Sequence, residues 1–286
     1  MREIYAASLI FRVKKPVFSL PYWHGGRWHA WFREACKMIG LKFDDLALAI
    51  QPLRFGQASL KPDEEIAVRM ILPADQWNNL LKFADILRTA RTDGLFSATS
   101  LGIVKIVDLA NGRILWQDDR PCGIGPRLFS ENALAAQVSR LRALNRFSLV
   151  FDGPLRLPAP RGFKNRQDEK YKYCQPAHFN EPGLTAHLLR RVRFLEEENG
   201  GEDNFDDFAP DLDASRLFWY DMRYNPVRQM ALGGICGRIV MAGKPGEAGA
   251  RRLVLGQYFG VGKNGRFGFG FWRIPEISPQ TDRQSS

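Results

Sequence analysis

Apolar positions in the first half of the chain repeat with a strand period in some segments and a helix period in others. Residues 3–13 centre on the apolar run Ala-Ala-Ser-Leu-Ile-Phe, which predicts a strand. Between 23 and 39, large apolar side chains recur at i, i+3, i+4 and i+7, typical of an amphipathic helix, and Gly40 is a natural stop for it. A strand period returns over 65–72, and a second amphipathic helix is predicted over 75–88.

A hairpin is the next predicted feature. Segments 102–109 and 113–117 are joined by Asn111-Gly112, a dipeptide that accepts the positive φ angles of a tight turn. The resulting order, β-α-β-(α)-β-β, resembles a ferredoxin-like unit with additions.

The second half shows a similar mixture of strands and helices. Strands are predicted at 147–157, 216–224, 234–241 and 266–274, and helices at 181–198 and 249–259. We therefore expect an α+β fold of two ferredoxin-like domains in tandem, residues 1–145 and 146–286.

Charge is distributed unevenly along the sequence. The net charge is +10, from 41 basic and 31 acidic residues, but segment 196–213 holds nine acids and no base. The rest of the chain therefore carries 22 acids against 41 bases, or +19. Such a balance indicates a polyanionic partner, with a solvated basic surface that binds nothing as the alternative.

Cysteine and apolar content narrow the class of protein. The four cysteines are far apart and form no Cys-x-x-Cys pair, which argues against a zinc site or a disulfide framework and fits a reducing cytoplasm. The first residues form no apolar signal region, and no apolar run approaches the length of a membrane span. We expect a cytoplasmic protein with no membrane partner, no metal and no cofactor.

The most distinctive segment is 256–273, which carries five glycines within eleven residues. Glycine lets the backbone approach a ligand closely, and successive N–H groups can form an anion-binding concavity. Lys263 and Arg266 add positive charge to it. Phe267, Phe269 and Trp272 either pack inward or stack on nucleotide bases.

The sequence matches a dinucleotide-binding motif, but the elements predicted around it are not those that the motif requires. Gly260–Gly265 satisfies G-x-G-x-x-G, but that site needs a preceding strand, a following helix and an acidic residue about 20 positions on. The predicted order here is helix and then strand. A P-loop is also disfavoured, because Asn264 stands where Ser or Thr follows the lysine.

Several blocks together resemble the CRISPR repeat-processing endoribonucleases, the Cas-six family of the RAMP superfamily. Segment 149–157 is similar to their strand that ends in a Thr/Ser-Pro turn, although Gly153 precedes the proline here. Segment 188–195 is similar to their arginine-bearing helix. Segment 232–240, a short helix and then Gly260-Val-Gly-Lys-Asn-Gly-Arg-Phe-Gly-Phe-Gly270 are similar to their glycine-rich ending. A weaker similarity covers the start of the first predicted helix, residues 21–33.

The resemblance implies two ferredoxin-like (RAMP/RRM-like) domains and metal-independent cleavage of precursor CRISPR RNA within its repeats. A ribose 2′-OH would attack the adjacent phosphate, leaving a 2′,3′-cyclic phosphate and a 5′-OH. The reaction needs a base, an acid and a cation at the phosphorane, roles suited to His and to Lys or Arg.

Candidate catalytic residues lie around the first helix. His29 is the preferred general base, since it falls where members of the family often carry a histidine. His24 and Tyr22 are further candidates, and Arg33 would serve an arginine-based variant. For a lone histidine on a helix, a structural role is the alternative.

Candidate RNA-binding residues fall in three segments: a basic-aromatic arm, the arginine-bearing helix and the glycine-rich loop. Their members are Lys164, Arg166, Lys170, Lys172, Arg190, Arg191, Arg193, Gly260, Gly262, Lys263, Gly265 and Arg266. The alternatives are a solvated basic face for the helix and a tight turn for the loop. Expected partners are precursor CRISPR RNA repeats or guide RNA and other CRISPR effector subunits. The alternative function is a non-catalytic RAMP subunit that binds guide RNA.

Overall fold

A computed structural model gives the structure of the chain. It describes residues 4–18, 20, 23–53, 56, 59–91, 96–109, 112–118, 120–122, 131–159, 172–180, 182–188, 211–225, 230–262 and 268–277. The chain divides into two compact units, one holding the described residues up to Cys122 together with Gly268, the other the remaining described residues from Glu131. The predicted boundary between 145 and 146 stays a prediction.

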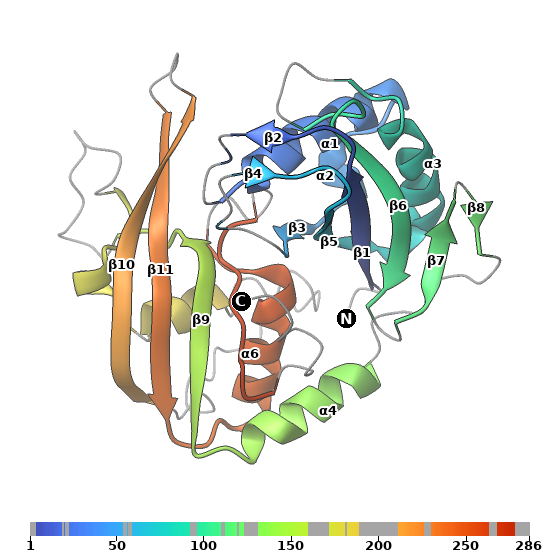
Figure 1. The fold of residues 1–286 in the computed structure, drawn as a ribbon. Coiled ribbons are helices and arrows are strands. Elements are labelled where there is room, and N and C mark those ends of the chain that lie inside the picture. Colours follow the sequence, from blue (N-terminus) through green and yellow to red (C-terminus); the bar gives the residue numbers. More distant parts are fainter. Residues whose placement is uncertain are drawn as a thin grey trace. The chain divides into compact units, whose positions relative to one another are not determined.

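The first unit is built on a six-stranded antiparallel sheet in the order β3-β5-β1-β6-β7-β8 (Figure 1). The strands are β1 (Ile4–Val13), β3 (Ala49–Pro52), β5 (Glu65–Pro73), β6 (Leu101–Asp108), β7 (Ile114–Gln117) and β8 (Arg120–Pro121). A two-stranded sheet pairs β2 (Val17–Phe18) with β4 (Ser59–Leu60). The helices are α1 (Gly25–Met38), α2 (Phe43–Leu46) and α3 (Trp77–Leu87), the last preceded by the 3₁₀ turn Ala74–Gln76. The chain order β1-α1-β3-β5-α3-β6 with the sheet order β3-β5-β1-β6 is ferredoxin-like, as predicted.

The predicted periodicities produce the core of this unit. The apolar stripe of α1 buries Trp28, Trp31 and Phe32, and Phe11 of β1 lies 4.9 Å from the Trp28 ring and 5.4 Å from the Trp31 ring, centroid to centroid. Gly40 follows the helix with a φ of +71°, the left-handed conformation that ends helices. The predicted hairpin is formed by β6 and β7.

The second unit is built on a three-stranded antiparallel sheet in the order β10-β11-β9. Its elements are α4 (Glu131–Arg142), β9 (Arg146–Leu155), the 3₁₀ turn Pro176–His178, a helical stretch over 182–188, β10 (Asp211–Asn225), β11 (Met230–Ala242) and α6 (Glu247–Phe259). Phe151 of the sheet, Leu253 of α6 and Leu184 of the helical stretch are each at most 1% exposed. Strand β10 begins at Asp211, earlier than the predicted residue 216, so Asp211 and Asp213 of the acidic segment lie in a strand.

The last predicted strand, 266–274, is wrong in its described part. Among the described residues, Arg273 forms an isolated bridge with Val150 of β9, through two hydrogen bonds (2.9 and 3.0 Å), and Gly270 makes a single hydrogen bond to Pro154. The reason is local: Gly268 and Gly270 take φ angles of +76° and +81°, which interrupt an extended chain. Arg273 still lies beside β9, where a fourth ferredoxin-like strand would pair, so the order β10-β11-β9-Arg273 keeps the ferredoxin-like arrangement.

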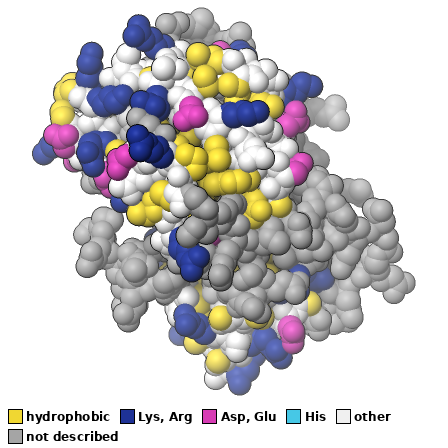
Figure 2. Space-filling view, turned by 90° about the vertical axis from the view of Figure 1, so that its right-hand side faces the viewer, with side chains coloured by type: hydrophobic (Ala, Val, Ile, Leu, Met, Phe, Trp, Pro, Cys, Tyr) yellow, Lys and Arg dark blue, Asp and Glu magenta, His cyan; other side chains and the backbone are white. Residues whose placement is uncertain are grey.

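On the face drawn in Figure 2, lysine and arginine side chains are spread over the surface with acidic side chains between them. On this face, therefore, the excess of basic residues does not by itself mark a binding site. Within the described part of the chain, no helix is long and apolar enough to cross a membrane.

Candidate functional site

His24 lies at the start of α1, in the N-cap position, and only 5% of its surface is exposed. Its carbonyl oxygen accepts the amide hydrogens of Arg27 (2.9 Å) and Trp28 (3.4 Å), which begins the helix. Its ring accepts at Nδ1 a hydrogen bond from Nε1 of Trp28 (3.0 Å) and lies edge-on to Phe96, with centroids 5.6 Å apart. His24 therefore helps to fix the start of α1 in the core.

His29 is less buried than His24 and lies five residues further along the chain, in α1. Its ring lies edge-on to Phe43 of α2, with centroids 5.4 Å apart. Arg33 follows at i+4, so both side chains project from the same helix face. The Arg33 side chain is 57% exposed, and its only ion pair among the described residues is a loose one with Glu34, at 3.7 Å. This face presents an imidazole and a guanidinium together, a combination that can move a proton and stabilise a phosphate.

The glycine-rich segment is folded back onto the end of β9. Gly260 and Gly262 have φ angles of +62° and +79°. Val261 donates its amide hydrogen to Gly270 (2.9 Å), and Gly270 donates its own to Pro154 of β9 (2.9 Å). A Cβ at Gly270 would overlap the carbonyl of Val261, so only glycine allows the two sides of this loop to come so close.

The residues that follow β9 join the described parts of two predicted RNA-binding segments. The carbonyl of Arg156 abuts Gly262 of the glycine-rich loop. The next residue, Leu157, accepts the amide hydrogen of Cys174 (2.8 Å), and Ala159 donates to the carbonyl of Lys172 (3.0 Å) at the end of the basic arm. Lys172, which is exposed, and Gly262 are thus held to one short segment, 156–159. We call this arrangement the β9 exit.

Arg156 is a residue of the β9 exit that sequence reasoning did not select. It is 2% exposed, and its guanidinium lies over the ring of Tyr173, 3.8 Å from the centroid. Stacking of this kind offsets part of the cost of burying a cation. In sequence Arg156 is one polar residue in an alternating strand, and nothing local distinguishes it from a solvent-facing arginine.

Two aromatic side chains of the glycine-rich segment pack inward. Phe269 and Trp272 are 0% and 1% exposed, and the Trp272 indole donates to the carbonyl of Leu253 (3.1 Å). The stacking role considered for them is therefore excluded in this conformation. A dinucleotide site is excluded as well, because α6, and not a strand, leads into Gly260.

Other predicted site residues lie outside the described residues: Tyr22, Lys164, Arg166, Lys170, Arg190, Arg191, Arg193, Lys263, Gly265 and Arg266. Their roles stay predictions. Within the described ranges, no group of three or more His, Cys, Asp or Glu side chains is arranged to hold a metal ion.

No family model and no curated protein matches the sequence. Among solved structures, a chain of a partial Cas6-RT-Cas1–Cas2 complex matches with a TM-score of 0.71 and 13% identity, over 96% of this chain and 46% of that chain. Thermus thermophilus Cas6 matches with a TM-score of 0.54 and 13% identity, over 96% and 99% of the two chains. A Cas6 product complex matches with a TM-score of 0.51 and 17% identity, over 95% and 99%.

The chain thus spans less than half of the first of these proteins and nearly all of the other two. Identities of 13–17% make this a likeness of fold. The chain has the α+β fold of Cas6 proteins.

Proposed function

We propose that the protein is a CRISPR-associated endoribonuclease that cleaves precursor CRISPR RNA within its repeats. The observation that carries the proposal is the match of nearly the whole chain to Cas6 structures, among them one determined as a product complex. The glycine-rich ending, through which the sequence resembles the same family, supports it independently. The free cysteines among the described residues are compatible with action in a reducing cytoplasm.

The proposed reaction is a metal-independent transesterification. A base removes the proton of a ribose 2′-OH, whose oxygen attacks the adjacent phosphorus. The bond to the 5′-oxygen breaks, and an acid protonates that oxygen as it leaves. The products are a 2′,3′-cyclic phosphate and a 5′-OH, and no water or metal ion is consumed. A cation beside the phosphorane stabilises the charge that develops there.

His29 is the proposed general base. Its ring is partly exposed on α1, and Arg33 lies on the same helix face to stabilise the phosphorane. His24 is a weaker candidate, because it is buried and its Nδ1 already accepts the Trp28 indole hydrogen. We therefore assign His24 to the support of α1 and His29 to the chemistry.

The β9 exit is the proposed RNA-binding element of the second unit. Lys172 supplies an exposed cation there, and Gly260 and Gly262 keep the backbone free of side chains that would block a phosphate. The predicted contacts of Lys263, Arg266 and the other basic residues named above would extend this surface.

The experiment is incubation of the purified protein with its own repeat RNA in excess EDTA. Cleavage at one position, with a cyclic phosphate on the upstream product, supports the proposal. Strict dependence on magnesium would exclude the mechanism. Tight binding without any cleavage would exclude the enzyme and favour a non-catalytic subunit that holds guide RNA.

A further inference from the structure

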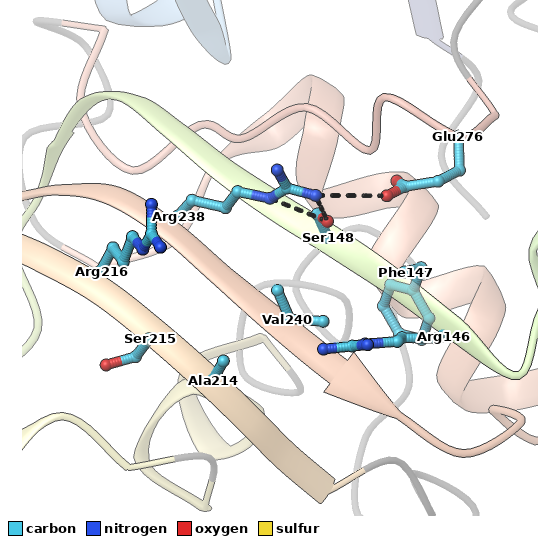
Figure 3. A pocket seen from close by; sticks show the side chains of 9 residues that line it. All are labelled: Arg146, Phe147, Ser148, Ala214, Ser215, Arg216, Arg238, Val240 and Glu276. Atoms are coloured by element: carbon cyan, nitrogen blue, oxygen red, sulfur yellow. Dashed lines mark hydrogen bonds and ion pairs between the residues drawn. The ribbon is translucent and has the colours of Figure 1, made fainter.

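One face of the sheet in the second unit carries arginines in place of an apolar layer. The opposite face packs Leu149 and Phe151, both at most 1% exposed, into the core. The arginine-bearing side forms a hollow of about 540 Å³, within the range of about 300–1,000 Å³ found for ligand sites. It is lined by Arg146, Phe147, Ser148, Ala214, Ser215, Arg216, Arg238, Val240 and Glu276 (Figure 3). We call this surface the arginine face.

Two of these arginines lie directly opposite each other. Arg216 of β10 and Arg238 of β11 are cross-strand partners, and like charges at opposite positions destabilise a sheet. The repulsion between the two guanidinium groups lowers the stability of the sheet. A bound anion would relieve it, because one phosphate can accept hydrogen bonds from two guanidinium groups.

The surroundings of the pair do not neutralise both charges. Arg238 is held down on the sheet by Ser148, which accepts from its Nε (3.0 Å), and its Nη2 lies 4.0 Å from Glu276. Figure 3 shows Arg238 extended toward Ser148 and Glu276, with Arg216 to its left on the neighbouring strand. Arg216 is exposed and forms no ion pair within the part of the chain that the structure describes. The unbalanced positive charge is therefore that of Arg216.

The third arginine does not add to this excess. Arg146 pairs with Asp213 at 2.5 Å, so its charge is already offset. The ligand is thus expected at the Arg216–Arg238 pair and not over the whole hollow.

An exposed aromatic ring lies beside the pair. Phe218 follows Arg216 by two positions in an uninterrupted part of β10, so both side chains project from the same face of the sheet. Phe218 is 52% exposed, although apolar packing would normally bury a ring of that size. The guanidinium pair and the exposed ring therefore provide a phosphate-binding site and a base-stacking surface next to each other.

We infer that the arginine face binds single-stranded RNA, with a phosphate between Arg216 and Arg238 and a base stacked on Phe218. Unpaired RNA is the occupant that fits both features, since phosphate contacts supply affinity and aromatic rings stack on splayed bases. The inference rests on the proposed function, in that RNA is the polyanion expected there, and it adds a site for a single-stranded segment of that RNA apart from the β9 exit.

The test uses the whole 286-residue chain and a fluorescein-labelled oligouridine of about ten nucleotides, within the usual site size of a single-strand-binding domain. Fluorescence anisotropy measures affinity over a series of salt concentrations. The variants are Arg216→Thr, Arg216→Lys and Phe218→Ala, and Arg88→Thr, at the exposed end of α3, is the matched control. Thermal unfolding of each variant checks the fold.

For Phe218→Ala we expect an affinity loss on the order of tenfold. For Arg216→Thr we expect the salt slope to fall by about 0.7, the value of one phosphate contact, while the melting temperature stays at or above that of the wild type because the opposed charge is gone. Arg216→Lys should keep the slope, and Arg88→Thr should match the wild type.

Wild-type affinity and slope in both Arg216→Thr and Phe218→Ala, or no binding of oligouridine by the wild type, would overturn the inference. Cleavage of repeat RNA by the wild type, measured separately, tests the proposed function. If the wild type cuts repeat RNA but these variants bind oligouridine as the wild type does, the inference is wrong and the proposed function stands. If the variants show the expected effects but the wild type never cuts, the proposed function is wrong and the inference stands.

Discussion

The carbonyl oxygen of Arg156 lies so close to Gly262 that a Cβ at that position would overlap it. This contact fixes the glycine-rich loop to the β9 exit, which also holds Lys172. The geometry of the loop therefore depends on a residue that carries no side chain at all.

Gly262→Ala should lower the free energy of unfolding by about 2–5 kcal/mol, since it adds both left-handed strain and steric overlap. Gly112→Ala is a matched control: its φ of +72° is similar to the +79° of Gly262, but no atom lies within 4 Å of its added Cβ. That control should cost only about 1–2 kcal/mol. Urea denaturation measures both, and equal losses would mean that the β9 exit does not constrain the loop.

His24→Ala should destabilise the first unit by about 2–4 kcal/mol, because it removes a buried ring and leaves the Trp28 indole without its acceptor. His29→Ala should cost about 1 kcal/mol or less, because that ring is partly exposed. The comparison is made by chemical denaturation at neutral pH. A larger loss for His29 than for His24 would reverse the roles that we assign to them.

Cysteine alkylation should be selective in the native protein. Burial raises the pKa of the Cys174 thiol to about 11 and that of Cys36 to about 12, so very little reactive thiolate is present at pH 8. Cys236 is buried as well, whereas Cys122 is exposed. Mass spectrometry after iodoacetamide treatment at pH 8 should find Cys122 modified first, and denaturant should expose all four. Early modification of Cys174 would contradict the packing of the β9 exit.

Lys172→Glu should weaken binding of repeat RNA on the order of tenfold, because it replaces a phosphate-binding cation with a repelling charge at the β9 exit. Lys82→Glu makes the same change on the exposed side of α3 and serves as the control. Filter binding at two salt concentrations measures both. Similar effects would show that the loss reflects net charge and not a site.

The periodic elements could be predicted from sequence because their patterns are local. Helix α1 follows from the spacing of Trp28, Trp31 and Phe32, and the ferredoxin-like order follows from the succession of strands and helices. Strand β10 was predicted too short, because its first residues are mostly exposed and show no apolar alternation. The final strand failed because two glycines with positive φ interrupt an apolar alternation that otherwise indicates a strand.

The site was harder to predict than the fold, because its determinants are contacts between distant segments. The burial of His24 depends on Phe96, and the role of Arg156 depends on Tyr173 and Gly262. No spacing of residues along the chain predicts these contacts. The arginine face was missed for the same reason, since the opposition of Arg216 and Arg238 exists only once β10 and β11 are paired in this register.

The most direct test of the central claim is single-turnover cleavage of the protein's own repeat RNA in excess EDTA, by the wild type and by His29→Ala. We predict a single cut with a 2′,3′-cyclic phosphate product by the wild type. His29→Ala should lower the rate on the order of 10²-fold or more with nearly unchanged RNA affinity, as expected for loss of a general base. Unchanged cleavage by His29→Ala would move the base elsewhere, and a wild-type protein that binds the repeat but never cuts it would contradict the account.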